Sequence, residues 1–195
     1  MTRALWLLAI QGALGAFDTL YYHEWRARLT ARGPATHPEL RLHAARDFVY
    51  AGLFCSLPWL AFHGVWASAL VALLAAEIII TLADFVTEDQ TRRSLGGVYS
   101  GERVTHSVMG IVYGAMLASL IPVLIDWWAR PTSLTRSTPA APKSLCLVLT
   151  LMGIGVFISG LRDTSAAMGL AHSDWPWGGS SEKDSRPYRD GVVDL

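Results

Sequence analysis

Hydrophobic residues run in long blocks along this chain, and charged residues gather between the blocks. Charges are almost absent from residues 4–17, 48–76, 108–125 and 145–161. A helix on the surface of a soluble protein would instead alternate apolar and charged positions with a period of 3.6 residues. A helix that crosses a bilayer needs about 20 mostly apolar residues. The pattern therefore predicts an all-α integral membrane protein.

The blocks predict about five transmembrane helices. The expected spans are residues 4–22, 39–63, 65–89, 102–128 and 144–170. Trp59, Trp66, Trp127 and Trp128 lie near span ends, as is typical of the aromatic belts at membrane interfaces. Residues 171–195 are polar and predict a disordered cytoplasmic tail. A cleaved signal peptide is the alternative interpretation of the first block.

Composition supports the membrane interpretation and excludes some functions. Hydrophobic residues make up 52% of the chain and charged residues 16%, whereas soluble domains average about 25% charged residues. Sixteen basic residues balance sixteen acidic ones, so no basic surface indicates nucleic-acid binding. Cys55 and Cys146 lie inside apolar blocks, where small buried hydrophobic residues are more common than disulfides.

The basic residues predict an orientation in the membrane. With five spans, one side collects twelve of the sixteen basic residues and the other side four. Because basic loops stay in the cytoplasm, we expect the N-terminus outside and the C-terminus in the cytoplasm, in a bacterial-type inner or plasma membrane. The twelve are Arg26, Arg28, Arg32, Arg41, Arg46, Arg92, Arg93, Arg103, Arg162, Lys183, Arg186 and Arg189, and the four are Arg3, Arg130, Arg136 and Lys143.

A helical hairpin is predicted to occur twice. Five polar positions recur in one order and at nearly one spacing, in repeat A (about residues 4–63) and repeat B (about residues 65–128), with residues 144–170 as an extra span. Two hairpins that enter the membrane in the same direction pack naturally around an axis along the membrane normal, so we expect a four-helix bundle. The matched pairs are Gln11 and Glu77, Asp18 and Asp84, Glu39 and Glu102, His43 and His106, and Tyr50 and Tyr113.

The repeat brings ligand-type side chains to the cytoplasmic half of the bundle. Glutamate and histidine four residues apart share a helix face, and each such pair is expected to meet an aspartate. Four carboxylates and two histidines match the donors of di-iron and di-manganese carboxylate bundles, although here the Glu–His spacing is four rather than three. We therefore predict two divalent metal ions, with iron or manganese favoured over zinc. The predicted ligands are Asp18, Glu39, His43, Asp84, Glu102 and His106.

Other polar residues are predicted to support this site. Glu77 lies seven residues before Asp84 and so about 10 Å deeper in the membrane, which makes it a candidate for catalysis. Tyr50 and Tyr113 are candidates to move protons with it. Asp47 and Glu88 are expected to hydrogen-bond the ligands and orient them.

Several alternatives explain the same residues. The helix dipole favours acids at helix starts without any metal, and nearby arginines can pair with them, which would make the polar ring a structural network. The acids could also line a cation path, although the outer halves of the helices offer few polar groups. Haem ligation by His43 and His106 is a further alternative.

The sequence thus gives two functional hypotheses. The first is a metal-dependent membrane oxidoreductase or hydrolase that acts on a lipid-like or quinone-like small molecule reaching the site through the bilayer. The alternative is a non-enzymatic membrane protein, either a transporter or a structural accessory subunit.

Overall fold

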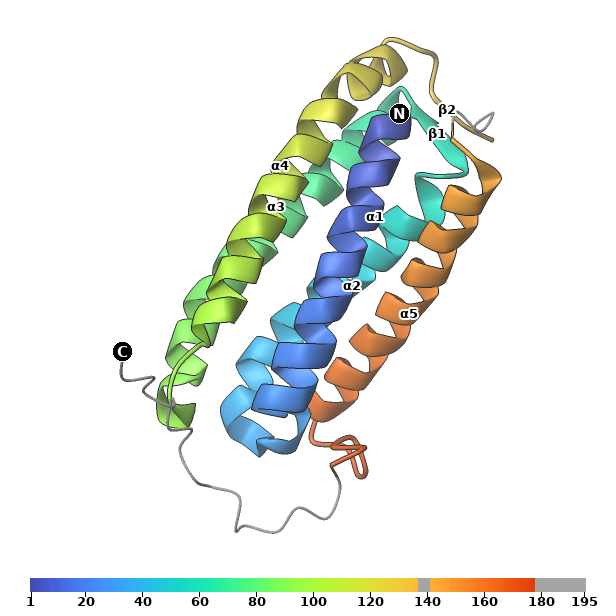
Figure 1. The fold of residues 1–195 in the computed structure, drawn as a ribbon. Coiled ribbons are helices and arrows are strands. Elements are labelled where there is room, and N and C mark those ends of the chain that lie inside the picture. Colours follow the sequence, from blue (N-terminus) through green and yellow to red (C-terminus); the bar gives the residue numbers. More distant parts are fainter. Residues whose placement is uncertain (137–140, 178–195) are drawn as a thin grey trace.

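Five long helices lie side by side in a computed structural model of the chain (Figure 1). The structure describes residues 1–136 and 141–177. The predicted disordered tail falls mainly on residues 178–195, which lie outside the described residues. The helices are α1 (Thr2–Phe17), α2 (His37–Ser56), α3 (Val65–Thr91), α4 (Ser100–Trp128) and α5 (Lys143–Ala167).

Shorter elements join the helices at the two ends of the bundle. We call the end that holds the two strands β1 (Leu60–His63) and β2 (Ser133–Arg136) the strand end, and the opposite one the polar end. The N-terminus lies at the strand end (Figure 1). At the polar end, a π-helix η1 (Asp18–Ala27) continues α1 directly. Three 3₁₀ turns complete this end: η2 (Leu29–Ala31), η3 (Gly33–Thr36) and η4 (Arg93–Leu95).

The strand end differs from the predicted helix boundaries. The second helix was expected to reach residue 63, but α2 ends at Ser56. Pro58 follows, and a proline inside a helix removes a backbone donor and clashes with the preceding turn. The chain then forms β1, which pairs antiparallel with β2, with Leu60 opposite Arg136. The sequence had predicted only a loop around β2.

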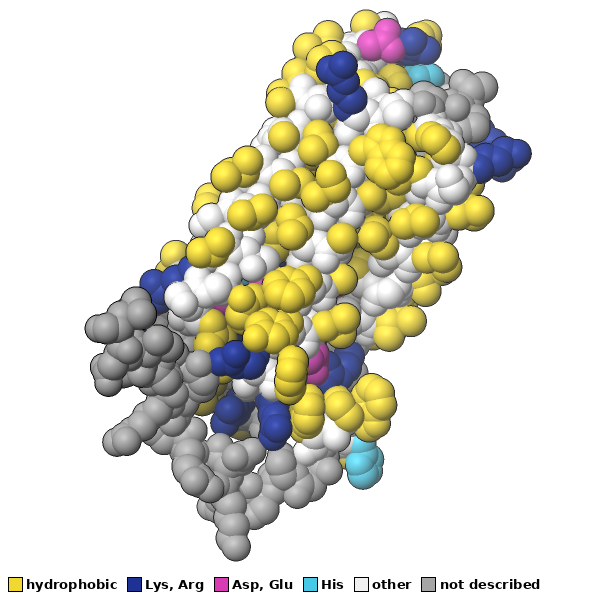
Figure 2. All heavy atoms as spheres, in the orientation of Figure 1, with side chains coloured by type: hydrophobic (Ala, Val, Ile, Leu, Met, Phe, Trp, Pro, Cys, Tyr) yellow, Lys and Arg dark blue, Asp and Glu magenta, His cyan; other side chains and the backbone are white. Residues whose placement is uncertain are grey.

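Four helical segments are long and apolar enough to cross a membrane. They are residues Thr2–Ala31, Val65–Thr91, Ser100–Trp128 and Lys143–Ala167. Their outward faces are apolar: Ile79 on α3, Ile111 on α4 and Leu151 on α5 are each at least 67% exposed. Figure 2 shows hydrophobic side chains over most of one face between the two ends. Such a surface suits contact with lipid rather than water.

Helix α2 is the exception among the five. It carries acidic, basic and histidine side chains in its first half, and Glu39 and His43 are buried. Its 20 residues are long enough to cross a membrane, but its charged residues keep it from the apolarity that the other four satisfy. The fifth span and the duplication of the hairpin therefore stay predictions.

The interior of the bundle divides into an apolar half and a polar half. Toward the strand end, the core consists of side chains such as Leu8, Leu53, Met116, Leu120 and Leu149, all 0% exposed. Toward the polar end, charged side chains take their place. The buried charged and histidine residues are Asp18, His23, Glu39, His43, Glu77, Asp84, Glu88, Arg92, Glu102 and Asp163.

Close contact between α2 and α5 fixes the position of the fifth helix. A Cβ atom added to Gly153 would lie 2.5 Å from the sulfur of Cys55, and one added to Gly160 would lie 3.1 Å from the Cβ of Asp47. Small residues let two membrane helices approach closely and pack well. The approach brings Asp163 of α5 toward the polar half of the bundle.

Candidate metal centre

The π-helix brings Asp18 and His23 to the same region. Residues five apart lie on different faces of an α-helix, but the hydrogen bonds of a π-helix run from i to i+5 and bring them onto one face. His23 Nε2 lies 3.4 Å from Asp18 Oδ2, and both side chains are buried. On α3, the spacing is one residue shorter: Asp84 and Glu88 are four apart on an ordinary α-helix, and both are buried.

Four buried side chains form a cluster that could hold a metal ion. These are Asp18, His23, Glu102 and His106, which offer one ligand atom each, and all four atoms lie within 4.8 Å of one another. His106 Nε2 lies 3.1 Å from Asp18 Oδ2, and His23 Nε2 lies 3.1 Å from Glu102 Oε1. Two imidazoles and two carboxylates are donors that divalent transition metals accept. We call these four residues the His–carboxylate cluster.

A second group of the predicted ligands lies beside this cluster. His43 Nε2 is 3.3 Å from Asp84 Oδ1 and 3.8 Å from Glu39 Oε1. The rings of His23 and His43 stack with centroids 4.5 Å apart, so the two groups are continuous. In each group, the aspartate of one hairpin contacts the histidine of the other.

Arg92 occupies the centre of the glutamates. It is 1% exposed. Its Nη2 lies 2.6 Å from Glu39 Oε1, 3.1 Å from Glu102 Oε1 and 3.5 Å from Glu88 Oε1. Burial alone would lower the pKa of Arg92, but the three carboxylates raise it above its ordinary value. The guanidinium therefore stays cationic and offsets part of the buried negative charge.

A second arginine pairs with the other predicted aspartate ligand. Arg46 Nη1 donates a hydrogen bond of 2.9 Å to Asp84 Oδ2. In the second group both carboxylates, Glu39 and Asp84, are bound by arginines. In the His–carboxylate cluster Arg92 binds Glu102, whereas Asp18 accepts hydrogen bonds from histidine alone in the described residues. The His–carboxylate cluster is the better prepared of the two for a cation.

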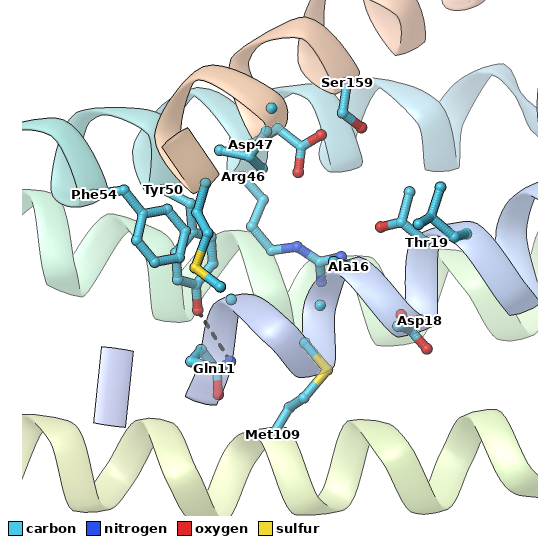
Figure 3. A pocket seen from close by; sticks show the side chains of 16 residues that line it. Gln11, Ala16, Asp18, Thr19, Arg46, Asp47, Tyr50, Phe54, Met109 and Ser159 are labelled. Atoms are coloured by element: carbon cyan, nitrogen blue, oxygen red, sulfur yellow. Dashed lines mark hydrogen bonds between the residues drawn. The ribbon is translucent and has the colours of Figure 1, made fainter. Parts of the chain in front are cut away.

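Carboxylates also lie near the outward nitrogens of two histidines. His106 Nδ1 is 3.6 Å from Glu88 Oε2, and the orienting role of Glu88 stays a prediction. His43 Nδ1 lies 4.0 Å from Asp163 Oδ2, a residue that the sequence analysis did not consider. Asp47, which was predicted for that role, lies against Ser159 at the edge of a cavity (Figure 3).

The predicted catalytic residues lie one layer closer to the middle of the bundle. Glu77 accepts a hydrogen bond of 2.9 Å from Thr81 Oγ1 and interacts with both Tyr50 and Tyr113. The two tyrosine rings are 6.3 Å apart. All three residues line a cavity of about 220 Å³ that reaches His106. The tyrosines and Glu77 are thus connected to the His–carboxylate cluster by open space.

The structure brings all six predicted ligands into one polar layer and adds three residues that the sequence did not single out. His23 was missed because its spacing from Asp18 fits no α-helical face, and only a π-helix makes it a neighbour. Arg92 was treated as a loop charge for orientation, although it is buried. Asp163 lacked any signal, because it lies on the extra helix outside the repeat.

No protein-family model matches the chain, and comparison with curated proteins and with solved structures finds no match.

Proposed function

We propose that this chain is a multi-pass membrane protein that binds a divalent transition metal at the His–carboxylate cluster. The observation that carries the proposal is that the four ligand atoms of Asp18, His23, Glu102 and His106 lie within 4.8 Å of one another in a buried site. Like charges so close together favour protonation or a cation between them. Iron and manganese suit two imidazoles with two carboxylates, and zinc accepts them as well.

A second metal is proposed beside the first. Glu39, His43 and Asp84 supply the donors, and His43 stacks on His23. Because Arg92 and Arg46 bind two of these carboxylates, a second ion must displace at least one arginine contact. The number of metal ions bound per chain therefore shows whether this second position is filled.

The proposed activity is that of a metal-dependent oxidoreductase or hydrolase acting on a lipid-like or quinone-like molecule. A bound divalent metal supplies Lewis acidity and activates water or oxygen. Glu77, with Tyr50 and Tyr113, lines the same cavity as His106 and is suited to hold or move a proton. The apolar outer faces of the helices give a membrane-dissolved substrate direct access to the protein.

The competing candidate is a structural polar network without metal. It is favoured by Arg92, which contacts three buried glutamates at once. In that case the ring of charges only fixes how the helices pack, and the protein serves as an accessory subunit. A transport function has less support, because the core toward the strand end is apolar and the described residues there offer an ion no polar path.

Metal analysis of the purified protein tests the proposal. We expect about one metal ion per chain in wild type, or about two if the second position fills, measured by mass spectrometry after purification without chelators. His106→Ala and His23→Ala should lose the first ion. His43→Ala should lose only the second. His63→Ala is the matched control, because His63 lies at the strand end beside Ser133.

Two results would decide against the metal site. A metal-free wild type that unfolds at the same temperature with and without added Fe²⁺, Mn²⁺ or Zn²⁺ would favour the structural network. Equal metal loss in His63→Ala and His106→Ala would show that the binding is not specific to the cluster.

A further inference from the structure

A cavity between α1, α2 and α5 leads from the lipid-facing surface to the polar layer (Figure 3). Its volume is about 320 Å³, at the lower limit of sites that hold small organic ligands. Ala16, Leu20 and Gly155 lie at its exposed rim. Phe54, Met109 and Met152 give it apolar walls. The cavity is therefore accessible from the bilayer and suited to an apolar chain.

The inner end of the cavity presents hydrogen-bond acceptors that lack a donor. Gln11 is 4% exposed, and its amide nitrogen donates to the Tyr50 hydroxyl at 3.3 Å. Among the described residues, its carbonyl oxygen Oε1 has no hydrogen-bond partner, and neither does Oδ1 of Asp18. Buried acceptors without a donor are costly and rare. Both residues line the cavity, so an occupant that carries a donor can satisfy one or the other of them.

Arg46 supplies the opposite kind of group. Its side chain extends into the cavity from α2 (Figure 3). Nη1 is used by Asp84, and no hydrogen bond among the described residues uses Nε or Nη2. The head group of an occupant can thus accept a hydrogen bond from Arg46 while it donates one to Gln11 or Asp18.

The charges of the lining exclude an anionic head group. Asp18 and Asp47 contribute two negative charges and Arg46 one positive charge. Asp84 compensates the guanidinium at 2.9 Å, and His106 contacts Asp18 at 3.1 Å, so Asp47 is the charge of the lining that no ion pair among the described residues offsets. A carboxylate or phosphate would meet net negative charge in a poorly solvated site, where repulsion is strong. A hydroxyl group both donates and accepts, and it carries no charge.

We propose that this cavity binds a single-chain lipid-like molecule with an uncharged, hydroxyl-bearing head group, which enters from the bilayer between α1 and α5. The hydroxyl accepts a hydrogen bond from Arg46 and donates one to Asp18, and the chain leaves past Gly155 into the lipid. Asp18 belongs to the His–carboxylate cluster, so the head group is placed next to it. The assignment of this molecule as the substrate rests on the proposed function.

Photo-crosslinking in phosphatidylcholine nanodiscs tests the proposal. The probes are hexadecanol and hexadecanoate, each with a diazirine beside the head group, and labelled peptides are mapped by mass spectrometry. We expect hexadecanol to label peptides of α1 and α5 about tenfold more than hexadecanoate. This ratio corresponds to a difference of about 1.4 kcal/mol in binding free energy. Asp47→Asn removes one negative charge from the lining, so it should raise labelling by hexadecanoate and lower the ratio of hexadecanol to hexadecanoate labelling.

Two glycine variants provide a matched pair. A Cβ atom added to Gly155 or to Gly114 meets nothing within 4 Å, so both substitutions are tolerated sterically. Gly155→Leu fills the rim of the cavity and should reduce labelling by hexadecanol about tenfold. Gly114→Leu changes an exposed position on α4 outside the cavity and should leave labelling unchanged.

The outcomes separate this inference from the metal site. Undiminished labelling of Gly155→Leu, or equal labelling of wild type by both probes, overturns the cavity assignment. Metal content is measured in the same preparations. A metal-free protein that still shows selective labelling, lost in Gly155→Leu, supports the cavity assignment while overturning the proposed metal function. A metal-loaded protein without selective labelling overturns the cavity assignment alone.

Discussion

Arg92 neutralises a group of acids that could not otherwise stay buried together. Glu39, Glu88 and Glu102 all lie within 3.5 Å of its Nη2. Each carboxylate lost its hydration on folding, and a cation at short range offsets part of that cost. The carboxylates raise the pKa of Arg92, so the guanidinium keeps its charge over the pH range in which the protein is handled. A bound metal would act on the same carboxylates, which makes this residue a sensitive probe of the site.

Replacing Arg92 should be strongly destabilising in the absence of metal. Arg92→Ala leaves three buried glutamates without their cation, and breaking such a buried network costs about 3–5 kcal/mol. Thermal unfolding in detergent, followed by circular dichroism, measures the loss. If the cluster binds metal, added Mn²⁺ or Zn²⁺ should restore part of the lost stability, because the metal replaces the missing positive charge.

The neighbouring residue is the matched control for this measurement. Arg93 also pairs with an acid, Asp89, but both side chains are more than half exposed. Arg93→Ala should change stability by less than about 0.5 kcal/mol. A comparable loss in both variants would contradict the central role of the buried guanidinium.

The π-helix is the element that the sequence could least predict. Between residues 84 and 106 the polar positions have the spacing of ordinary α-helices, so the sequence alone was enough to name Asp84, Glu102 and His106 as candidate ligands. His23 needed knowledge of a local backbone change that no periodicity indicates. The strand pair at the other end was missed for a related reason, since residues 60–63 and 133–136 are far apart in sequence and pair only after the bundle has formed. The apolar blocks, by contrast, predicted the long helices because bilayer thickness sets their length.

Deleting one residue from the π-helix should be tolerated, unlike the same change in α3. Deletion of the exposed Leu20 brings Asp18 and His23 to a spacing of four, which an α-helix places on one face. Metal content and unfolding temperature should then stay close to wild type. Deletion of the exposed Val86 turns Glu88 and Arg92 about 100° around α3, and unfolding should occur at least ~5 °C lower. An equal drop in unfolding temperature after both deletions would contradict the interpretation that the chain accommodates one extra residue by forming the π-helix η1.

The contact of α2 with α5 should be sensitive to the size of one side chain. A Cβ atom on Gly153 would lie 2.5 Å from Cys55 Sγ and 3.1 Å from the Cβ of Phe54. Gly153→Val should therefore cost about 1–3 kcal/mol through overpacking. Gly155→Val, two residues along the same helix, meets open space and should change stability little. Unfolding temperatures of the two variants in the same detergent provide the comparison.

At the scale of the whole molecule, the two ends of the bundle differ in kind. The polar end combines the buried charges with most of the basic residues, while the strand end is closed by an apolar core and the β1–β2 pair. The distribution of arginines predicts that the polar end faces the cytoplasm. Substrate access through the bilayer, rather than from either aqueous side, follows if the cavity between α1 and α5 is the route to the cluster.

Cysteine labelling determines both the orientation and the fifth span. In a background of Cys55→Ser and Cys146→Ala, we expect an impermeant maleimide to label Thr135→Cys on intact spheroplasts, and to label Ala35→Cys and Ser94→Cys only after lysis. Ala35 precedes α2, whereas Thr135 lies on β2, which pairs with β1 just after α2. All three positions are exposed. Labelling of Ala35→Cys and Thr135→Cys from the same side would show that α2 does not cross the membrane. Labelling of only Ala35→Cys and Ser94→Cys before lysis would reverse the orientation, and the His–carboxylate cluster would then lie toward the outer face.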